Sequence, residues 1–201
     1  MVNRVEAALR RIASDLDFRQ AEWALVGGFA VSARAEPRFT RDVDVAVLVD
    51  GDAAAEQLVR SLTADGYSLE ALVEQDAVGR LATARLISPG VNGVGVVVDL
   101  IFATAGIEAE IVAEAEVLEI LPGVSMPVAT TGHLVALKLL ARDDETRPQD
   151  AADLLALASI LGPEDRRTAR TAVELIVERG FGRGRSLSAL LDAYLADARD
   201  A

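Results

Sequence analysis

Two aspartates spaced two residues apart give the strongest chemical signal in the sequence. Asp42 and Asp44 lie in the valine-rich stretch 41–49, whose alternating pattern predicts a β-strand. Strand periodicity places both carboxylates on one face, where repulsion and burial are unfavourable unless a cation compensates them. Two hard oxygen ligands suit Mg²⁺, or Mn²⁺ in its place, because such an ion completes its coordination with water and phosphate. The alternative is a pair of ordinary, solvated surface acids.

A pair of glycines precedes this strand. Gly27 and Gly28 follow a short apolar run of strand type and open a helical segment. Glycines let the backbone approach a ligand closely, and the amides at a helix N-terminus attract phosphate. A tight turn is the simpler interpretation of such a pair. Arg38 and Thr40 lie between the glycines and the two aspartates.

Two further charged residues lie in apolar surroundings. Asp99 interrupts the apolar strand predicted at 94–102 and needs a partner, either a shared metal or an arginine such as Arg85. Lys138 is the single lysine among 20 basic residues and lies on an apolar helix predicted at 131–142. An ammonium group on a flexible stem can reach a phosphate from a buried helix face, although an ordinary surface lysine is the simpler interpretation.

Composition restricts the classes of function. The 201 residues are 51% hydrophobic and 26% charged, which predicts a folded protein of one domain, or of a domain with a small lobe. The absence of cysteine excludes disulfides and thiolate sites, and the lone His133 excludes a multi-histidine metal site. A net charge of −12 disfavours non-specific binding to nucleic acid. We expect a cytoplasmic protein with no membrane partner, since no leader and no long apolar run occurs.

The hydrophobic pattern predicts an α/β (α+β) fold. Residues 1–130 form a core with a mixed sheet and flanking helices, and residues 131–201 form a helical lobe. Helices are predicted at 2–17, 29–35, 52–64, 107–114, 131–142, 148–161, 164–179 and 187–198. Strands are predicted at 23–26, 41–49, 67–73, 81–87, 94–102, 116–121 and 124–128, with a turn at Pro89-Gly90 and Asn92-Gly93.

These motifs in combination resemble a known family. The run Val26-Gly-Gly-Phe-Ala30, followed by Arg38-x-Thr-x-Asp-x-Asp44, resembles the first motif of nucleotidyltransferases with a DNA polymerase β-like core. It is most similar to the AbiEii-type toxin branch, which the stretches 133–154 and 179–185 also resemble. The resemblance implies a nucleotidyltransferase-like mixed sheet whose active site is completed by the helical lobe.

The resemblance also implies roles for individual residues. It implies that Asp42, Asp44 and Asp99 are catalytic and hold the metal, and that Lys138 is catalytic or binds the triphosphate. The nucleotide-binding residues that it implies are Gly27, Gly28, Arg38, Thr40, Lys138 and Asp150. For Asp150, stabilisation of a helix N-terminus is a sufficient alternative.

The implied activity is Mg²⁺-dependent transfer of a nucleotide from a nucleoside triphosphate to an acceptor hydroxyl or phosphate, with release of pyrophosphate. In relatives the acceptor is often tRNA, and a separate antitoxin protein neutralises the enzyme. The excess of acidic residues leaves open a cationic small-molecule acceptor of the aminoglycoside type. A catalytically silent nucleotidyltransferase fold that acts as a binding protein is a third interpretation.

Overall fold

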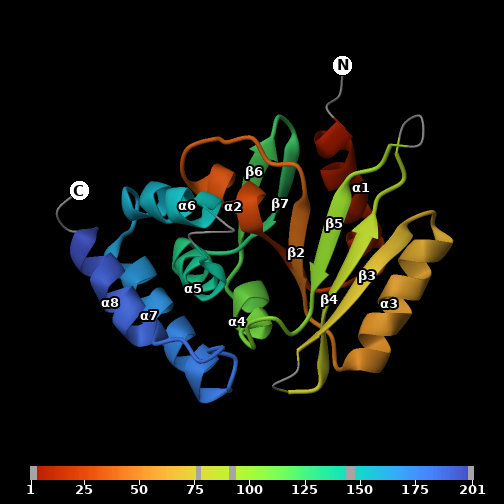
Figure 1. Cartoon of the computed structure of the whole chain (residues 1–201). Helices are drawn as coiled ribbons and strands as arrows, with labels where there is room; N and C mark the ends of the chain where they lie inside the picture. The colour runs from red at the N-terminus through yellow and green to blue at the C-terminus, as the bar shows by residue number, and fades with distance from the viewer. Residues whose placement is uncertain (1–3, 76–77, 91–93, 144–147, 199–201) are drawn as a thin grey trace.

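The computed structural model describes residues 4–75, 78–90, 94–143 and 148–198, which contain a mixed sheet with helices on both faces (Figure 1). Its strands are β1 (Trp23–Val26), β2 (Val43–Val47), β3 (Ser68–Gln75), β4 (Arg80–Ile87), β5 (Val97–Ile101), β6 (Glu116–Leu121) and β7 (Val124–Val128). Its helices are α1 (Arg4–Phe18), α2 (Gly27–Arg34), α3 (Asp52–Ala64), α4 (Glu108–Ala113), α5 (Thr131–Ala141), α6 (Pro148–Ala158), α7 (Pro163–Glu178) and α8 (Leu187–Asp197).

The seven strands lie in the order β3-β4-β5-β2-β1-β7-β6, so β2 is at the centre of the sheet. Strand β2 runs parallel to β5 and antiparallel to β1, while β1 runs parallel to β7. The hairpins β3–β4 and β6–β7 are antiparallel. The predicted α/β class and mixed sheet are thereby confirmed. The strand that contains Asp44 is the central one, with three strands on each side.

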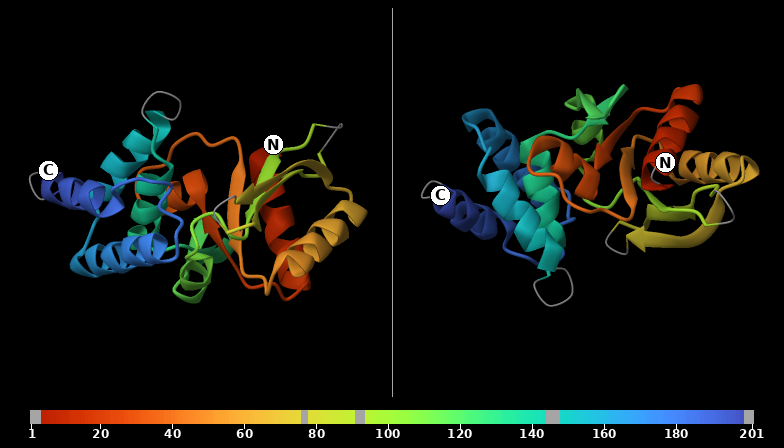
Figure 2. Two further views of the ribbon diagram at one scale, coloured as in Figure 1. Left: turned by 60° about the horizontal axis from the view of Figure 1, so that its bottom comes forward. Right: turned by 90° about the horizontal axis from the view of Figure 1, so that it is seen from above.

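Helices cover the two faces of the sheet unequally. Helices α1 and α3 lie behind the sheet, and α2, α4 and α5 lie in front of it beside the central strands (Figures 1 and 2). Alternation along β2 explains this arrangement: Val43, Val45 and Val47 are fully buried, whereas Asp44 and Ala46 point to the opposite face. The apolar face therefore packs on helices, and the face with Asp44 remains for chemistry.

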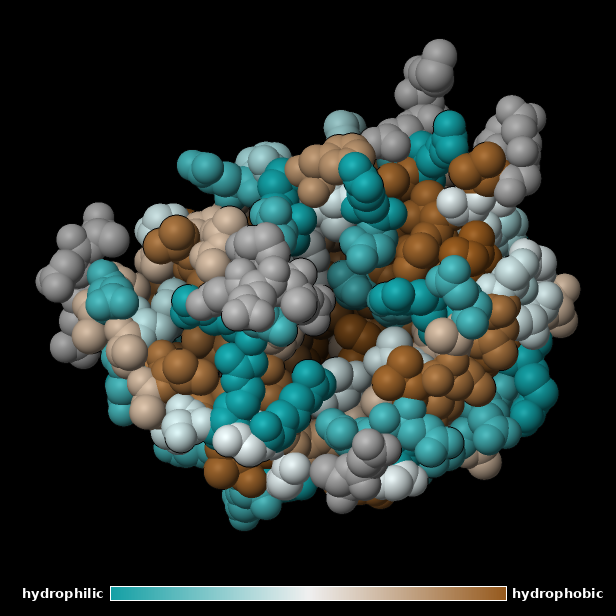
Figure 3. Space-filling view, viewed as in Figure 1, coloured by the Kyte–Doolittle hydropathy of each residue, from teal (hydrophilic) through white to brown (hydrophobic). Residues whose placement is uncertain are grey.

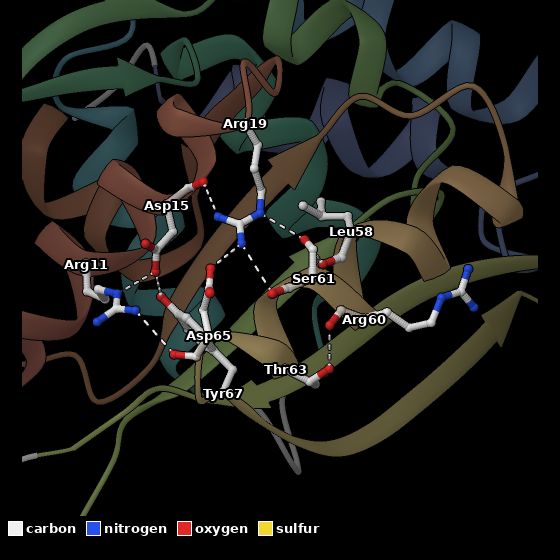
Figure 4. Close-up of polar contacts among 9 residues, drawn as sticks. All are labelled: Arg11, Asp15, Arg19, Leu58, Arg60, Ser61, Thr63, Asp65 and Tyr67. Carbon is white, nitrogen blue, oxygen red and sulfur yellow. Dashed lines mark hydrogen bonds and ion pairs between the residues drawn. The ribbon is translucent and has the colours of Figure 1, made fainter.

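The back layer is fixed by polar contacts between α1 and α3. Arg19 donates to the Ser61 hydroxyl at 2.8 Å and is paired with Asp65, and the Tyr67 hydroxyl donates to Asp15 at 2.9 Å (Figure 4). These bonds tie the end of each helix to the other element. Because α1 and α3 lie behind the sheet, these contacts do not involve its front face.

Some element boundaries differ from the prediction. Strand β2 begins at Val43 rather than at residue 41, so Asp42 lies just before the strand and only Asp44 lies within it. Strand β2 begins where its pairing with β5 begins, at Val43 opposite Val98, and β1 pairs with it only from Asp44 to Val47. Helix α2 begins at Gly27, so both glycines belong to its first turn. The predicted turn residues Asn92-Gly93 lie outside the described residues.

The segments after β7 are helical, as predicted. Helix α5 packs against α7 and α6, and α8 packs against α7 (Figure 1). The predicted boundary at residue 130 falls between β7 and α5, and its role as a domain boundary stays a prediction. Among the described helices, none has the length and apolar composition needed to cross a bilayer.

The crossing of α5 and α7 depends on Gly132. A Cβ atom at this position would lie 2.5 Å from the carbonyl oxygen of Asp165 and 2.7 Å from the Cβ of Thr168. We therefore expect Gly132→Ala to lower the free energy of unfolding by about 1–3 kcal/mol through overpacking, measured by urea denaturation. Gly182→Ala is the control, because its nearest neighbour would be 3.8 Å away. An unchanged midpoint for Gly132→Ala would show that the helices are not in close contact there.

Candidate active site

Asp44 lies at the centre of the site because three elements meet around it. It is half-buried in β2, its register partner in β1 is Val26, and its register partner in β5 is Asp99. A Cβ at Gly27, whose φ is +62°, would lie 1.9 Å from Oδ2 of Asp44. The Asp44 carboxylate therefore lies directly against the first residue of α2, and only glycine fits there in both space and backbone conformation.

Gly28 is needed for a different contact. A Cβ at this position would lie 2.6 Å from Nη2 of Arg38 and 2.9 Å from Oγ1 of Thr40. Thr40 is buried, and its hydroxyl accepts a hydrogen bond from Nη1 of Arg38 at 3.4 Å. The two glycines therefore leave room for the side chains of Asp44, Arg38 and Thr40, as well as for any phosphate that binds there.

A buried network of ion pairs joins the helical segments to the segment before β2. Nζ of Lys138 lies 2.7 Å from Oδ1 of Asp150 and 2.7 Å from Oδ2 of Asp153. Arg38 donates to both oxygens of Asp153, through Nε at 2.6 Å and Nη2 at 2.9 Å. Both acids are almost fully buried. Asp150 thus lies beside Lys138, and Arg38 pairs with Asp153, while its contact with nucleotide stays a prediction.

Asp99 is paired with an arginine in this structure. Nε and Nη2 of Arg85, its register partner on β4, donate to the two oxygens of Asp99 at 2.9 and 2.7 Å. This bidentate pair corresponds to the alternative given for Asp99 from the sequence. Its role as a metal ligand stays a prediction, and that role requires Arg85 to release the carboxylate.

The donor set can be tested for a metal. Within the described residues, no cluster of three or more His, Cys, Asp or Glu side chains has the arrangement of a metal site. Asp42 and Asp44 alone fit an ion such as Mg²⁺, which takes one or two protein carboxylates and fills its other positions with water and phosphate. Because a Cβ at position 27 would fill the space beside Asp44, the glycine keeps this carboxylate accessible.

A cleft of about 160 Å³ opens between the sheet and α5. Gly27, Asp44, Lys138 and Asp150 contribute to its polar lining, and aliphatic side chains of β5, α4 and α5 form most of its walls. Figure 3 shows this region as a hollow with hydrophobic side chains at its floor. Thr104, Glu108 and Arg183 also line the cleft. No sequence pattern pointed to Thr104 or Glu108, and the segment 179–185 was singled out only by its resemblance to the AbiEii-type branch.

A second hollow of about 300 Å³ adjoins the cleft at Asp44, Ile101 and Thr104 and lies over β3, β4 and β5. It is lined by Ala71, Val73, Thr83, Arg85, Asp99, Ile101, Thr104 and Asp44 itself. Asp44 therefore borders two cavities, which is the arrangement that a reaction between two substrates needs.

Two buried ionisable groups near the cleft have altered pKa values. Burial raises the pKa of the Glu108 carboxyl, although its Oε1 accepts hydrogen bonds from the amides of Thr104 and Ala105 at 2.7 Å. Burial lowers the pKa of His133 to about 4, so its ring is neutral at pH 7. His133 Nδ1 lies 3.0 Å from the hydroxyl of Thr130, the N-cap of α5. Both groups stabilise local structure rather than contacting the two-aspartate motif.

Comparison with known proteins identifies the family. The sequence matches the family described as "Nucleotidyl transferase AbiEii toxin, Type IV TA system" over residues 7–200. The chain belongs to this AbiEii family. The resemblance seen in the motifs is thereby confirmed, and the family match extends through the middle of the chain. The protein is accordingly a nucleotidyltransferase.

Solved structures show the same fold. A nucleotidyltransferase-like protein from Paracoccidioides brasiliensis is 20% identical, with a TM-score of 0.54 over 94% of this chain and 93% of its own. The lincomycin-bound lincosamide antibiotic adenylyltransferase LnuA is 15% identical, with a TM-score of 0.50 over 79% of this chain and 99% of its own. A search of curated proteins finds no match. At these identities the likeness establishes the fold.

The lowered pKa of His133 predicts a pH-dependent loss of stability. The unfolded chain takes up a proton near pH 6.5, whereas the folded chain takes it up only near pH 4. Stability therefore falls as the pH decreases from 6.5 to 4, by up to about 3 kcal/mol from this residue. Urea denaturation across this range should show that His133→Asn, which keeps a polar atom facing Thr130, has the shallower pH dependence. Parallel curves for the two proteins would contradict a neutral, buried His133.

The ion pair of Arg38 with Asp153 should be strongly coupled. A double-mutant cycle with Arg38→Ala and Asp153→Ala should give a coupling free energy of about 2–3 kcal/mol, because either single substitution removes one of the ion pairs of a largely buried network. The exposed pair Arg170–Asp192, at 2.7 Å, is the control and should give less than about 1 kcal/mol. Equal coupling in both cycles would show that the buried network does not hold the segment before β2.

Proposed function

We propose that this chain is a divalent-metal-dependent nucleotidyltransferase toxin that transfers a nucleotide from a nucleoside triphosphate to the end of an RNA such as tRNA, and that a separate antitoxin protein neutralises it. The observation that carries this proposal is the position of Asp44. Its carboxylate lies against the N-terminus of α2 and borders both the cleft with Lys138 and the hollow over β3–β5. The family description supports the toxin and antitoxin roles.

The residues of the first cleft suit a triphosphate. The amides of Gly27 and Gly28 begin α2, and amides at a helix N-terminus favour bound phosphate. Lys138 lines the same cleft and contributes a compact positive charge. In this proposal Asp42 and Asp44 hold Mg²⁺, or Mn²⁺ in its place, and the bound ion supplies charge neutralisation at the phosphates. Arg38 and Thr40 position Gly28 and the segment that ends at Asp42.

The reaction is an in-line substitution at the α-phosphorus. A hydroxyl oxygen of the acceptor forms the new bond to phosphorus, the bond to the bridging oxygen breaks, pyrophosphate leaves, and the hydroxyl proton is released. Positioning of the two substrates supplies much of the rate enhancement in such reactions. The hollow over β3–β5 is the place for the acceptor, because it adjoins the cleft and borders the same carboxylate.

The acceptor has two chemically distinct candidates. The family description is of a toxin, and the resemblance of the motifs implies tRNA as its acceptor. The overall excess of 32 acidic over 20 basic residues favours a cationic small molecule such as an aminoglycoside, and the hollow itself has Asp44 and Asp99 beside the paired Arg85. We place RNA first because the family match covers nearly the whole chain.

One experiment tests both the metal site and the acceptor. We expect the double variant Asp42→Asn/Asp44→Asn to lose Mn²⁺ binding in electron paramagnetic resonance titrations. It should also lose transfer of label from radiolabelled triphosphates by about 100-fold or more, since two metal-holding charges are removed. Asp192→Asn, an exposed acid on α8, is the control. The acceptors compared are tRNA and a panel of aminoglycosides and lincosamides.

The outcomes separate the interpretations. Mn²⁺ affinity and transfer that are unchanged in the double variant would refute the metal assignment. Label found on small molecules alone would refute the RNA acceptor and the toxin role. Absence of any triphosphate-dependent rise in melting temperature, with Mg²⁺ present, would favour a silent binding protein. Growth inhibition on expression in bacteria, lost in the double variant, is the result expected of a toxin.

A further inference from the structure

The segment between α7 and α8 holds an arginine in a backbone conformation that favours glycine. Among the residues described by the structure, Gln20 and Arg183 are the non-glycine residues with positive φ, and φ of Arg183 is +53°. Gly180 and Gly184, on either side of it, also have positive φ, at +84° and +68°. A left-handed conformation is unfavourable for a side chain with a Cβ, so an arginine here carries a conformational cost that glycine would not.

The neighbouring arginines hold this segment against both walls of the cleft. Arg179 pairs with Glu110 in the first turn of α4 and donates to the carbonyl of Gly106. Arg185 donates to the carbonyl of Leu140 at 3.0 Å, near the C-terminus of α5. Both guanidinium groups therefore fix the position of this segment. Arg183 lies between these two residues in the sequence.

Arg183 lines the nucleotide cleft. Its Nη2 donates to the carbonyl of Thr104 at 3.3 Å, and Thr104 follows the end of β5. The register of β5 with β2 places Asp99 beside Asp44 and Ile101 beside Ala46, so Thr104 lies further along the cleft than the two-aspartate motif. Arg183 therefore lies at the part of the cleft away from the end of β2 that carries Asp44.

Much of the wall of the cleft is apolar. Ile101, Ile111, Leu134 and Leu137 line the same cleft as Gly27, Asp44 and Arg183. A nucleoside triphosphate combines the matching chemistry, with an anionic tail and a flat, largely apolar base. A guanidinium group can stack on such a base and can donate to its ring acceptors.

We propose that Arg183 contacts the nucleobase of the bound nucleoside triphosphate. This inference rests on the proposed function, since it requires a nucleotide in the cleft. A contact with the base would explain why an arginine occupies a backbone conformation that favours glycine. Backbone strain of this kind persists at binding sites, where the side chain is needed. Arg183 acts on binding and selection of the nucleotide, whereas Asp44 and Lys138 act at its phosphates.

The test compares ligands that have and lack a base. Isothermal titration with Mg²⁺ present would measure the Kd of each of the four nucleoside triphosphates and of inorganic tripolyphosphate, for the wild type, Arg183→Gly and Gln20→Gly. We expect Arg183→Gly to raise the Kd of the tightest-binding nucleotide about tenfold and to leave that of tripolyphosphate within about twofold. Gln20→Gly relieves the same backbone conformation far from the cleft and should change neither Kd.

Melting temperature gives a readout that a structural role would change. We expect Arg183→Gly to melt at the wild-type temperature or above it, as Gln20→Gly does, because glycine suits a positive φ. A lower melting temperature for Arg183→Gly, or an equal loss of affinity for tripolyphosphate, would overturn the contact with the base. Unchanged nucleotide affinity would overturn it while leaving the proposed function intact. A wild-type protein that binds none of the triphosphates would overturn both.

Discussion

Asp153 accepts hydrogen bonds from two cations that come from different parts of the chain, Lys138 on α5 and Arg38 in the segment before β2. Burial of any one of these charges by itself would be strongly unfavourable, and their pairing compensates that cost. Helix α6 is consequently fixed against both α5 and the segment that leads to Asp42. The helical part of the chain cannot shift relative to the sheet without breaking this network, so the distance between the two-aspartate motif and Lys138 is set by ion pairs on α6.

Much of the fold and the core of the site could be predicted from local patterns. The valine alternation around Asp44 identified β2, because a strand with one buried face has a period of two. The apolar helix with a single lysine indicated α5, and the hairpin of β6 and β7 followed from two apolar runs around Pro122-Gly123. These features depend on residues that are close together in the sequence, so a local sequence pattern is enough to predict them.

The remaining features depend on contacts between distant residues. Asp99 is paired with Arg85 because the register of β4 with β5 places them side by side, and register follows from the pairing of whole strands. The close fit of Asp44 against Gly27 arises from the pairing of β1 with β2. The residues next to Gly27 in the sequence therefore could not show that glycine is also needed to make room for Asp44. Arg183 belongs to the cleft only because the segment after α7 packs against α4 and α5.

Lys138 shows why one basic position differs from all the others in this arginine-rich chain. Its ammonium group lies between two carboxylates on α6, 2.7 Å from each, and also borders the cleft. An ammonium group has three donors arranged around a point charge, so it can face two acids and a third group in different directions. A guanidinium group is planar and pairs side-on with one carboxylate, as Arg38 does with Asp153 and Arg85 with Asp99. Lysine and arginine would both supply the positive charge at this position. The arrangement of the two carboxylates around it favours lysine.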